Sequence, residues 1–114
     1  MAIPSGSGTE VLKVAKVHAM SSGATTLITG VANHIYTVLS INFTNMSGSD
    51  ESIDLYVTEG SDTYMLLRET PIADKATFMY NDKFVLSGAQ TLKANLATSG
   101  DCDVWVSYID QDWS

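Results

Sequence analysis

The side chains that could carry acid–base or nucleophilic chemistry are few and scattered. The chain has two histidines, His18 and His34, and neither falls in a recognisable catalytic motif. Nucleophilic catalysis requires a nucleophile, a base within hydrogen-bond reach and a group that orients the base. We expect both histidines to be ordinary residues at strand ends. The sequence therefore predicts no catalytic residue and no enzymatic activity.

Metal and thiol chemistry are equally poorly supported. Three acidic segments could supply oxygen ligands, at residues 101–103, 110–112 and 49–51, but none matches an EF-hand loop. The single cysteine, Cys102, excludes an intramolecular disulfide and a zinc site built on paired cysteines. Its two aspartate neighbours should raise rather than lower its pKa. We predict solvated turn carboxylates, no metal and no cofactor.

The aromatic and methionine side chains are more informative. Trp105 and Tyr108 fall on opposite faces of one expected strand, so one of them should point away from the core. Met79 and Tyr80 precede a short polar turn, and Trp113 lies near the carboxyl end. Exposed aromatic and Met side chains are typical of subunit interfaces, although the same residues could complete a small core. We predict a partner interface that includes Met79, Tyr80, Trp105 and Trp113.

The composition limits the remaining function classes. A length of 114 residues indicates one domain. The net charge of −7 and the scattered basic residues argue against direct binding of nucleic acid. No apolar run approaches the roughly 18 residues of a membrane span, so we expect no membrane contact. The amino terminus lacks the basic and apolar segments of a secretory signal.

Apolar and polar residues alternate through most of the chain, as in half-buried strands. In His34–Asn45 the odd-numbered positions from Ile35 to Phe43 share one face, and the even-numbered positions from Tyr36 to Thr44 share the other. Residues 10–20 have valines at a spacing of three, which could mark a helix, but three valines lower helix propensity and we expect a strand. Further strands are expected at residues 24–29, 53–58, 64–68, 75–80, 84–86, 92–97 and 104–108.

These strands and the turn clusters between them predict an all-β fold. We expect residues 10–114 to form a single β-sandwich of eight or nine short antiparallel strands, with jelly-roll-like connections. Residues 1–9 should form a flexible N-terminal arm, because Pro4 is followed by the linker sequence Ser5-Gly6-Ser7-Gly8. The apolar tip of this arm, Ala2-Ile3-Pro4, joins the predicted partner interface.

The charges are unevenly distributed along the sequence. Residues 1–49 hold one acid and two bases, a net charge of +1, and residues 50–114 hold twelve acids and four bases, a net charge of −8. We expect this split to separate a docking side from a solvent side. Ser and Thr supply 25 of the 114 residues. A surface of small neutral polar groups loses little solvation energy on contact and suits a protein that is bound to others.

Three segments resemble a known class of proteins: Met1–Leu12 (MAIPSGSGTEVL), Ala32–Phe43 (ANHIYTVLSINF) and Val104–Asp110 (VWVSYID). They are similar to small virion structural proteins of tailed bacteriophages, of the head-decoration (cement) or tail-associated β-sandwich kind. The resemblance spans most of the chain, and its motifs are structural. It implies synthesis in the cytoplasm of a host bacterium and a final place in the virion, on the outside of the capsid.

For such a protein the resemblance implies a mechanical role. A cement protein binds across capsomers, with the major capsid protein or other virion proteins as partners, and stabilises the DNA-filled head. Trimers are the usual form in this class, so a homotrimer is expected. The alternative is a tail, neck or fibre-associated module, structural or receptor-binding, that uses aromatic and Asn/Asp side chains against glycans. A small β-sandwich hydrolase would need an acid–base constellation that the sequence does not display.

Overall fold

The computed structural model describes residues 9–98 and 100–113, and all regular structure in this part of the chain is β-strand. The described residues include no helix that could cross a membrane. Of the predicted arm, Thr9 is the first residue of a strand, and residues 1–8 lie outside the described part. The strands are β1 (Thr9–Met20), β2 (Thr25–Thr29), β3 (His34–Asn45), β4 (Glu51–Glu59), β5 (Asp62–Ile72), β6 (Thr77–Tyr80), β7 (Phe84–Ser87), β8 (Thr91–Leu96) and β9 (Cys102–Asp112).

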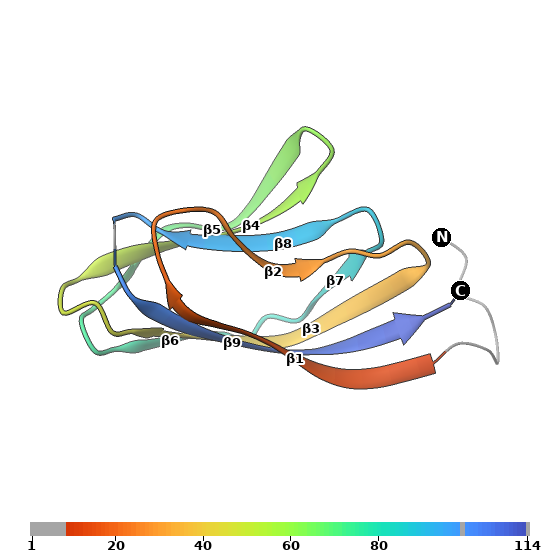
Figure 1. The fold of residues 1–114 in the computed structure, drawn as a ribbon, viewed down its shortest axis with the longest axis horizontal. Coiled ribbons are helices and arrows are strands. Elements are labelled where there is room, and N and C mark those ends of the chain that lie inside the picture. Colours follow the sequence, from red (N-terminus) through yellow and green to blue (C-terminus); the bar gives the residue numbers. More distant parts are fainter. Residues whose placement is uncertain (1–8, 99, 114) are drawn as a thin grey trace.

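The strands form two antiparallel sheets that pack face to face (Figure 1). One sheet has the order β1-β9-β3-β6, with β7 also paired to β3, and the other has the order β2-β8-β4-β5. The pairing is nested: β1 pairs with β9, β2 with β8, β3 with β6 and β7, and β4 with β5. A long hairpin rolled into two layers has this arrangement, which is that of a jelly roll. The prediction of an all-β sandwich is confirmed.

The valine-rich first segment is a strand, as expected, and not a helix. The largest differences in extent are in β5 and β9, which are longer than the alternation indicated. In β5 the pattern is interrupted by Pro71, which lacks a backbone N–H. The structure tolerates this proline because β5 lies at the edge of its sheet, where one side of the strand needs no ladder partner.

The faces predicted for β3 are wrong in its first half. Tyr36 and Val38 are buried, and the sequence of buried positions resumes at Ile41 and Phe43. The pairing with β9 shifts between Val38 and Ser40, so that Leu39 is an extra residue. This β-bulge reverses the alternation by one position. A strict period of two therefore assigns the core face correctly only after the bulge.

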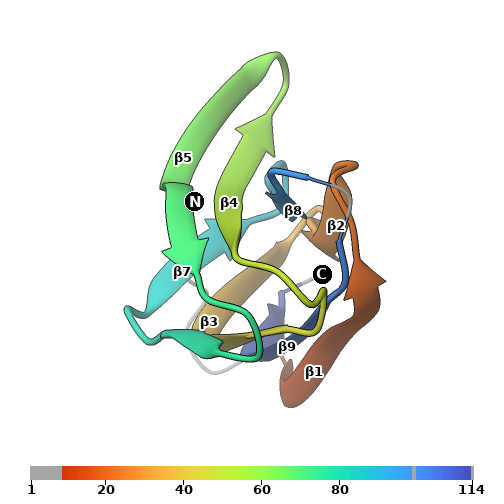
Figure 2. The ribbon, with the colours of Figure 1, turned by 90° about the vertical axis from the view of Figure 1, so that its left-hand side faces the viewer.

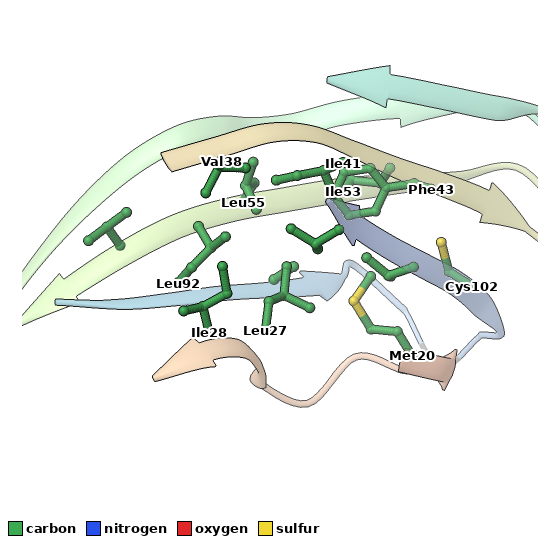
Figure 3. Packing of buried hydrophobic residues seen from close by; sticks show 14 of the residues in the cluster. Met20, Leu27, Ile28, Val38, Ile41, Phe43, Ile53, Leu55, Leu92 and Cys102 are labelled. Atoms are coloured by element: carbon green, nitrogen blue, oxygen red, sulfur yellow. The ribbon is translucent and has the colours of Figure 1, made fainter. Parts of the chain in front are cut away.

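The core lies between the two sheets and draws on both. Val38, Ile41 and Phe43 of β3 and Leu55 of β4 have no solvent exposure. Figure 3 shows these side chains filling the space between the sheets. Cys102 is also fully buried and free, and burial raises the pKa of its thiol to about 11. The sandwich is thus held together by apolar packing, with a thiol that stays protonated at neutral pH.

The acidic residues gather on the four-stranded sheet. Seven of the thirteen acids lie between Asp50 and Asp74, in β4, β5 and their flanking turns. The hairpin of β4 and β5 projects beyond the body of the sandwich (Figures 1 and 2). In contrast, the near-neutral first 49 residues are divided between the two sheets, because β1 and β3 lie in one and β2 in the other. The charge split in the sequence is therefore not a division into two sides of the molecule.

Candidate interaction surface

The outer face of the five-stranded sheet combines exposed apolar side chains with few charges. Directly opposed residues in an antiparallel pair share a face, so the strand registers define which side chains lie together. Because Val104 and Val106 of β9 are buried, the alternate residues of this strand point outward. We call this surface the outer face. Its members are Glu10, Leu12, Val14 and Lys16 of β1, Asp103, Trp105, Ser107, Ile109 and Gln111 of β9, Ile35, Thr37, Ser40, Asn42 and Thr44 of β3, Thr77 and Met79 of β6, and Val85 and Ser87 of β7.

One row of side chains crosses this face from edge to edge. Lys16 pairs with Trp105, Trp105 pairs with Asn42, and Asn42 pairs with Met79. Trp105 is 49% exposed and Met79 is 52% exposed. The structure therefore brings together two of the predicted interface residues, which come from strands far apart in the sequence. Of the pair Trp105 and Tyr108, Trp105 is the one that points away from the core.

An open hollow of about 380 Å³ lies beside Trp105. Its polar lining comes from the three neighbouring strands β1, β9 and β3, with Lys16, His18, Asn42, Thr44 and Asp103 around the indole. The Lys16 ammonium lies 5.8 Å from the centroid of the Trp105 ring, within the range of a cation–π contact. The hollow thus combines an aromatic ring, a cation and neutral hydrogen-bonding groups.

Two polar side chains of the hollow, Asp103 and Asn42, differ in whether they have hydrogen-bond partners. The Asp103 carboxylate accepts a hydrogen bond from the Ala19 backbone N–H at 3.0 Å and lies 3.1 Å from His18 Nδ1. Asn42 Oδ1 is buried, and no group of the described residues donates a hydrogen bond to it. A buried acceptor without a donor is costly. The hollow is therefore lined by one acceptor that has no donor among the described residues.

The other predicted interface residues lie elsewhere. Tyr80 is opposite Ile41, on the inner side of β6, and its ring meets Phe84 edge to face at 5.9 Å. Trp113 is half-buried, and its backbone N–H donates to the Asn33 carbonyl at 2.8 Å. The arm residues Ala2, Ile3 and Pro4 lie outside the described part of the chain. For all of these the interface assignment stays a prediction.

Sequence reasoning missed the apolar residues at the two ends of the outer face. Leu12 is 72% exposed, Val85 is 60% exposed, and Val14 is also exposed. A signal was present for β1, because Val11, Leu12 and Val14 place apolar side chains on both faces of one strand. Exposed apolar side chains on both faces of a strand are suited to contact with another chain. For Val85 the strand is too short for its pattern to be informative.

A buried ionic cluster lies at the end of the sandwich where β1 begins. The Asp110 carboxylate is 5% exposed overall and accepts hydrogen bonds from Lys13 Nζ at 2.9 Å and from His34 Nδ1 at 2.7 Å. Burial alone would raise the pKa of Asp110, but the two hydrogen bonds and the neighbouring positive charge outweigh it and hold the pKa below its usual value. The Asp110 hydrogen bond in turn raises the pKa of Lys13.

This cluster does not have the layout of a general base. The second ring nitrogen of His34, Nε2, lies 3.5 Å from the Asp112 carboxylate, so that both nitrogens face carboxylates. A catalytic histidine needs one nitrogen directed at a nucleophile or a substrate proton. The cluster instead ties β1, β3 and β9 together. Among the described residues no group of three or more His, Cys, Asp and Glu side chains is arranged to hold a metal.

Comparisons with known proteins identify the fold and not the family. No family model matches the chain, and a search of curated proteins finds no match. Among solved structures, a protein of the Bacillus endospore appendages, which form disulfide-linked pili, has a TM-score of 0.59 at 13% identity. The match covers 100% of this chain and 97% of the pilus chain.

Two further similar structures come from viral particles. A chain of the capsid structure of the Helicobacter pylori bacteriophage KHP30 has a TM-score of 0.54 at 9% identity, with 95% of both chains covered. The subviral particle protein VP2 of infectious bursal disease virus has a TM-score of 0.60 at 7% identity, with 94% of this chain covered. This chain corresponds to only 33% of VP2. These likenesses show a jelly-roll sandwich that occurs in proteins of viral particles and of a pilus.

Proposed function

We propose that this protein is a non-enzymatic structural component of a bacteriophage virion, and specifically a cement protein on the outside of the capsid. The observation that carries the proposal is the outer face of the five-stranded sheet. It exposes Leu12, Val14, Met79, Val85 and Trp105 among polar groups that are mostly neutral. An apolar surface with few charges is suited to contact with another protein. The acidic four-stranded sheet would then face the solvent.

The similar structures support an assembly role. The matched phage capsid chain has nearly the same length as this one, because 95% of each is covered. A small sandwich without an appended domain can thus be a component of a phage capsid. In the pilus protein, subunits are joined by disulfides, whereas Cys102, the one cysteine of this chain, is fully buried. A disulfide between folded copies would require Cys102 to become exposed, so the virion role is favoured over a disulfide-linked fibre.

The predicted N-terminal arm would add to this docking. Residues Ala2, Ile3 and Pro4 supply an apolar tip, and β-strand addition to a neighbour is a common way for such a segment to bind. Binding of several capsid subunits at once would multiply a weak single contact. The homotrimer stays a prediction of the same proposal.

The experiment is a binding assay with purified capsids that lack the protein. We expect Trp105→Ser and Met79→Ser to reduce occupancy, because hot-spot side chains often contribute more than about 2 kcal/mol each. The matched controls are Tyr64→Ser and Met65→Ser, whose side chains are 53% and 39% exposed on β5 of the other sheet. Equal losses for both sets would show that the outer face is not the docking surface. Absence of the protein from purified virions would refute the virion role altogether.

The alternative of a tail or fibre module that binds glycans is favoured by one observation, the hollow beside Trp105. An indole ring flanked by Asn42, Asp103 and His18 offers stacking and hydrogen bonds together. A glycan array with the wild-type protein and Trp105→Ala distinguishes the two roles. Saccharide binding that is lost in the variant, without binding to capsids, would support the alternative. Binding only to capsids would support the cement protein.

A further inference from the structure

The first strand leaves one of its two edges open. β1 pairs with β9 on one side, and no strand of the described residues pairs with it on the other. Figure 2 shows β1 at the margin of the molecule. An open edge presents unpaired backbone N–H and C=O groups and is a template for another strand. Val11, Leu12 and Val14 add exposed apolar side chains on both faces of this edge.

The regular part of β1 is centred on one residue. Its pairing with β9 is continuous from Thr9 to Val17 and is interrupted by a register shift between Val17 and Met20. At this bulge Ala19 has a φ of 60°, and its N–H is bound to the Asp103 carboxylate. Lys13 lies at the midpoint of Thr9–Val17. A second β1 that runs antiparallel about a two-fold axis at Lys13 would therefore pair along the whole regular stretch.

The outward side chains of β1 are self-complementary about the same point. In order along the strand they are Glu10, Leu12, Val14 and Lys16. A two-fold axis at Lys13 places Glu10 opposite Lys16 of the second copy and Leu12 opposite Val14 of the second copy, each contact occurring twice. Opposite charges and apolar residues directly across an antiparallel pair stabilise it.

Within one chain the two charged residues are not used in ion pairs. Glu10 accepts a hydrogen bond from the neutral Gln111 amide at 2.9 Å, and Lys16 lies over the Trp105 ring. No residue of the described part forms a salt bridge with either. Both charges are therefore available to a second copy. An axis moved by one residue would place Glu10 opposite Val14, or Lys16 opposite Leu12, and would lose the charge match.

On the inward face of β1, Lys13 could oppose pairing. The axis places Lys13 opposite Lys13 of the second copy, and like charges across a pair repel. An inward charge on an edge strand can also serve to prevent pairing. Here the Asp110 carboxylate lies 2.9 Å from the Lys13 ammonium, so each copy brings its own counter-charge. Val11 meets Ala15 on the same side, which adds an apolar contact.

We propose that two copies of this chain pair through β1, antiparallel about Lys13, and so join their five-stranded sheets into one continuous sheet. With the axis normal to the sheet, the outer faces of both copies lie on the same side. The inference concerns a contact between copies and does not rest on the proposed place in the virion. Pairing through β1 gives assemblies with an even number of copies, whereas the sequence predicts a homotrimer.

A charge swap tests the pairing. Glu10→Lys and Lys16→Glu each turn two attractive contacts of the dimer into repulsive ones. From typical cross-strand pair energies we expect each single variant to weaken the dimer by about tenfold or more. The double variant, which has the composition and net charge of the wild type, restores both contacts in reverse, and we expect its dimer Kd to return to within about threefold of the wild type. Sedimentation equilibrium measures Kd, and thermal melting shows whether each variant is folded.

Cysteine cross-linking tests the register. In the proposed pairing Leu12 is opposite Val14 of the second copy, so Leu12→Cys/Val14→Cys should form a covalent dimer on mild oxidation. Each single variant places its own two thiols a diagonal step apart, more than about 7 Å between Cα atoms, and should not cross-link. Native Cys102 is buried and serves as the internal control. A wild type that stays monomeric at high concentration, or a dimer insensitive to the charge reversals, would overturn the proposal.

Discussion

Replacement of Asp110 by asparagine tests whether the buried ionic cluster stabilises the fold. A hydrogen bond to a charged group contributes about 1.5–3 kcal/mol. We apply a value near the lower end of this range to the bond from His34, which is mostly buried, and less than about 1 kcal/mol to the bond from Lys13, because its side chain is 45% exposed and can turn to water. Asp110→Asn should therefore lower the free energy of unfolding by about 1.5–2.5 kcal/mol. For a domain of this size that corresponds to a fall in Tm of about 10 °C.

The pH dependence of this difference follows from the two pKa shifts. The pKa of Asp110 is lowered in the folded state. The stability that this carboxylate contributes is therefore fully present above its unfolded pKa of about 3.9, and it is lost as the pH falls through the folded pKa. The pKa of Lys13 is raised, so its contribution is fully present below about 10.4 and is lost as the pH rises through the folded value. The contribution of the Lys13–Asp110 ion pair should therefore be fully present from about pH 5 to 9, and the difference between wild type and variant should shrink in stronger acid.

Urea unfolding followed by tryptophan fluorescence, at pH 7 and again near pH 3, measures both quantities. The matched control is Asp62→Asn, which removes the same charge at the exposed tip of the β4–β5 hairpin and should change stability by less than about 0.5 kcal/mol. The reasoning fails if Asp110→Asn behaves like this control at pH 7. It also fails if the full difference persists near pH 3, because the loss would then come from shape and not from charge.

Three further outcomes are expected. Gly30→Ala should destabilise the fold by about 2 kcal/mol or more, because a Cβ there would lie 2.3 Å from the Gln90 carbonyl oxygen. Thermal melting measures this loss. The control is Gly23→Ala, whose Cβ would meet nothing within 4 Å and which should leave the Tm unchanged. Asn45→Ala should cost about 3 kcal/mol in urea unfolding, because its buried amide donates to the backbone carbonyls of Ser49 and Ile72. Cys102 should stay unreactive toward a thiol reagent at pH 8 and react only after denaturation, because it is fully buried and burial raises its pKa to about 11. Fast labelling of the native protein would contradict this prediction.

The fold class could be predicted from the sequence because alternation and turn residues are local patterns. The alternation in β3 and β9 and the turn residues between strands show where strands lie, although not how far β5 and β9 extend. The faces of β3 were assigned wrongly before Leu39 because a bulge depends on the register with β9 and not on the strand itself. Similarly, Pro71 obscured the length of β5, and only the position of this strand at a sheet edge explains why the proline is tolerated.

The interaction surface could be predicted only in part, because it is assembled across strands. Trp105 and Met79 were identified by residue type, yet nothing local shows that both pair with Asn42 in one row. Asp110 and His34 were assigned to solvated or ordinary positions, whereas the structure places them 2.7 Å apart in a buried cluster. Contacts between residues 76 positions apart in the sequence leave no periodic signal in a single sequence.

The nested pairing of the strands has a consequence for how the chain is made. Of the nine described strands, β1 is synthesised first and its partner β9 last, and the Lys13–Asp110 ion pair closes a span of 97 residues. On a ribosome β1 therefore emerges with both edges open and its apolar side chains exposed, and it must wait for nearly the whole chain before it can pair. Contacts of such long range slow folding. The two lysines and the glutamate of β1 would then also have a role before the fold exists, as charges that keep an unpaired strand from aggregating.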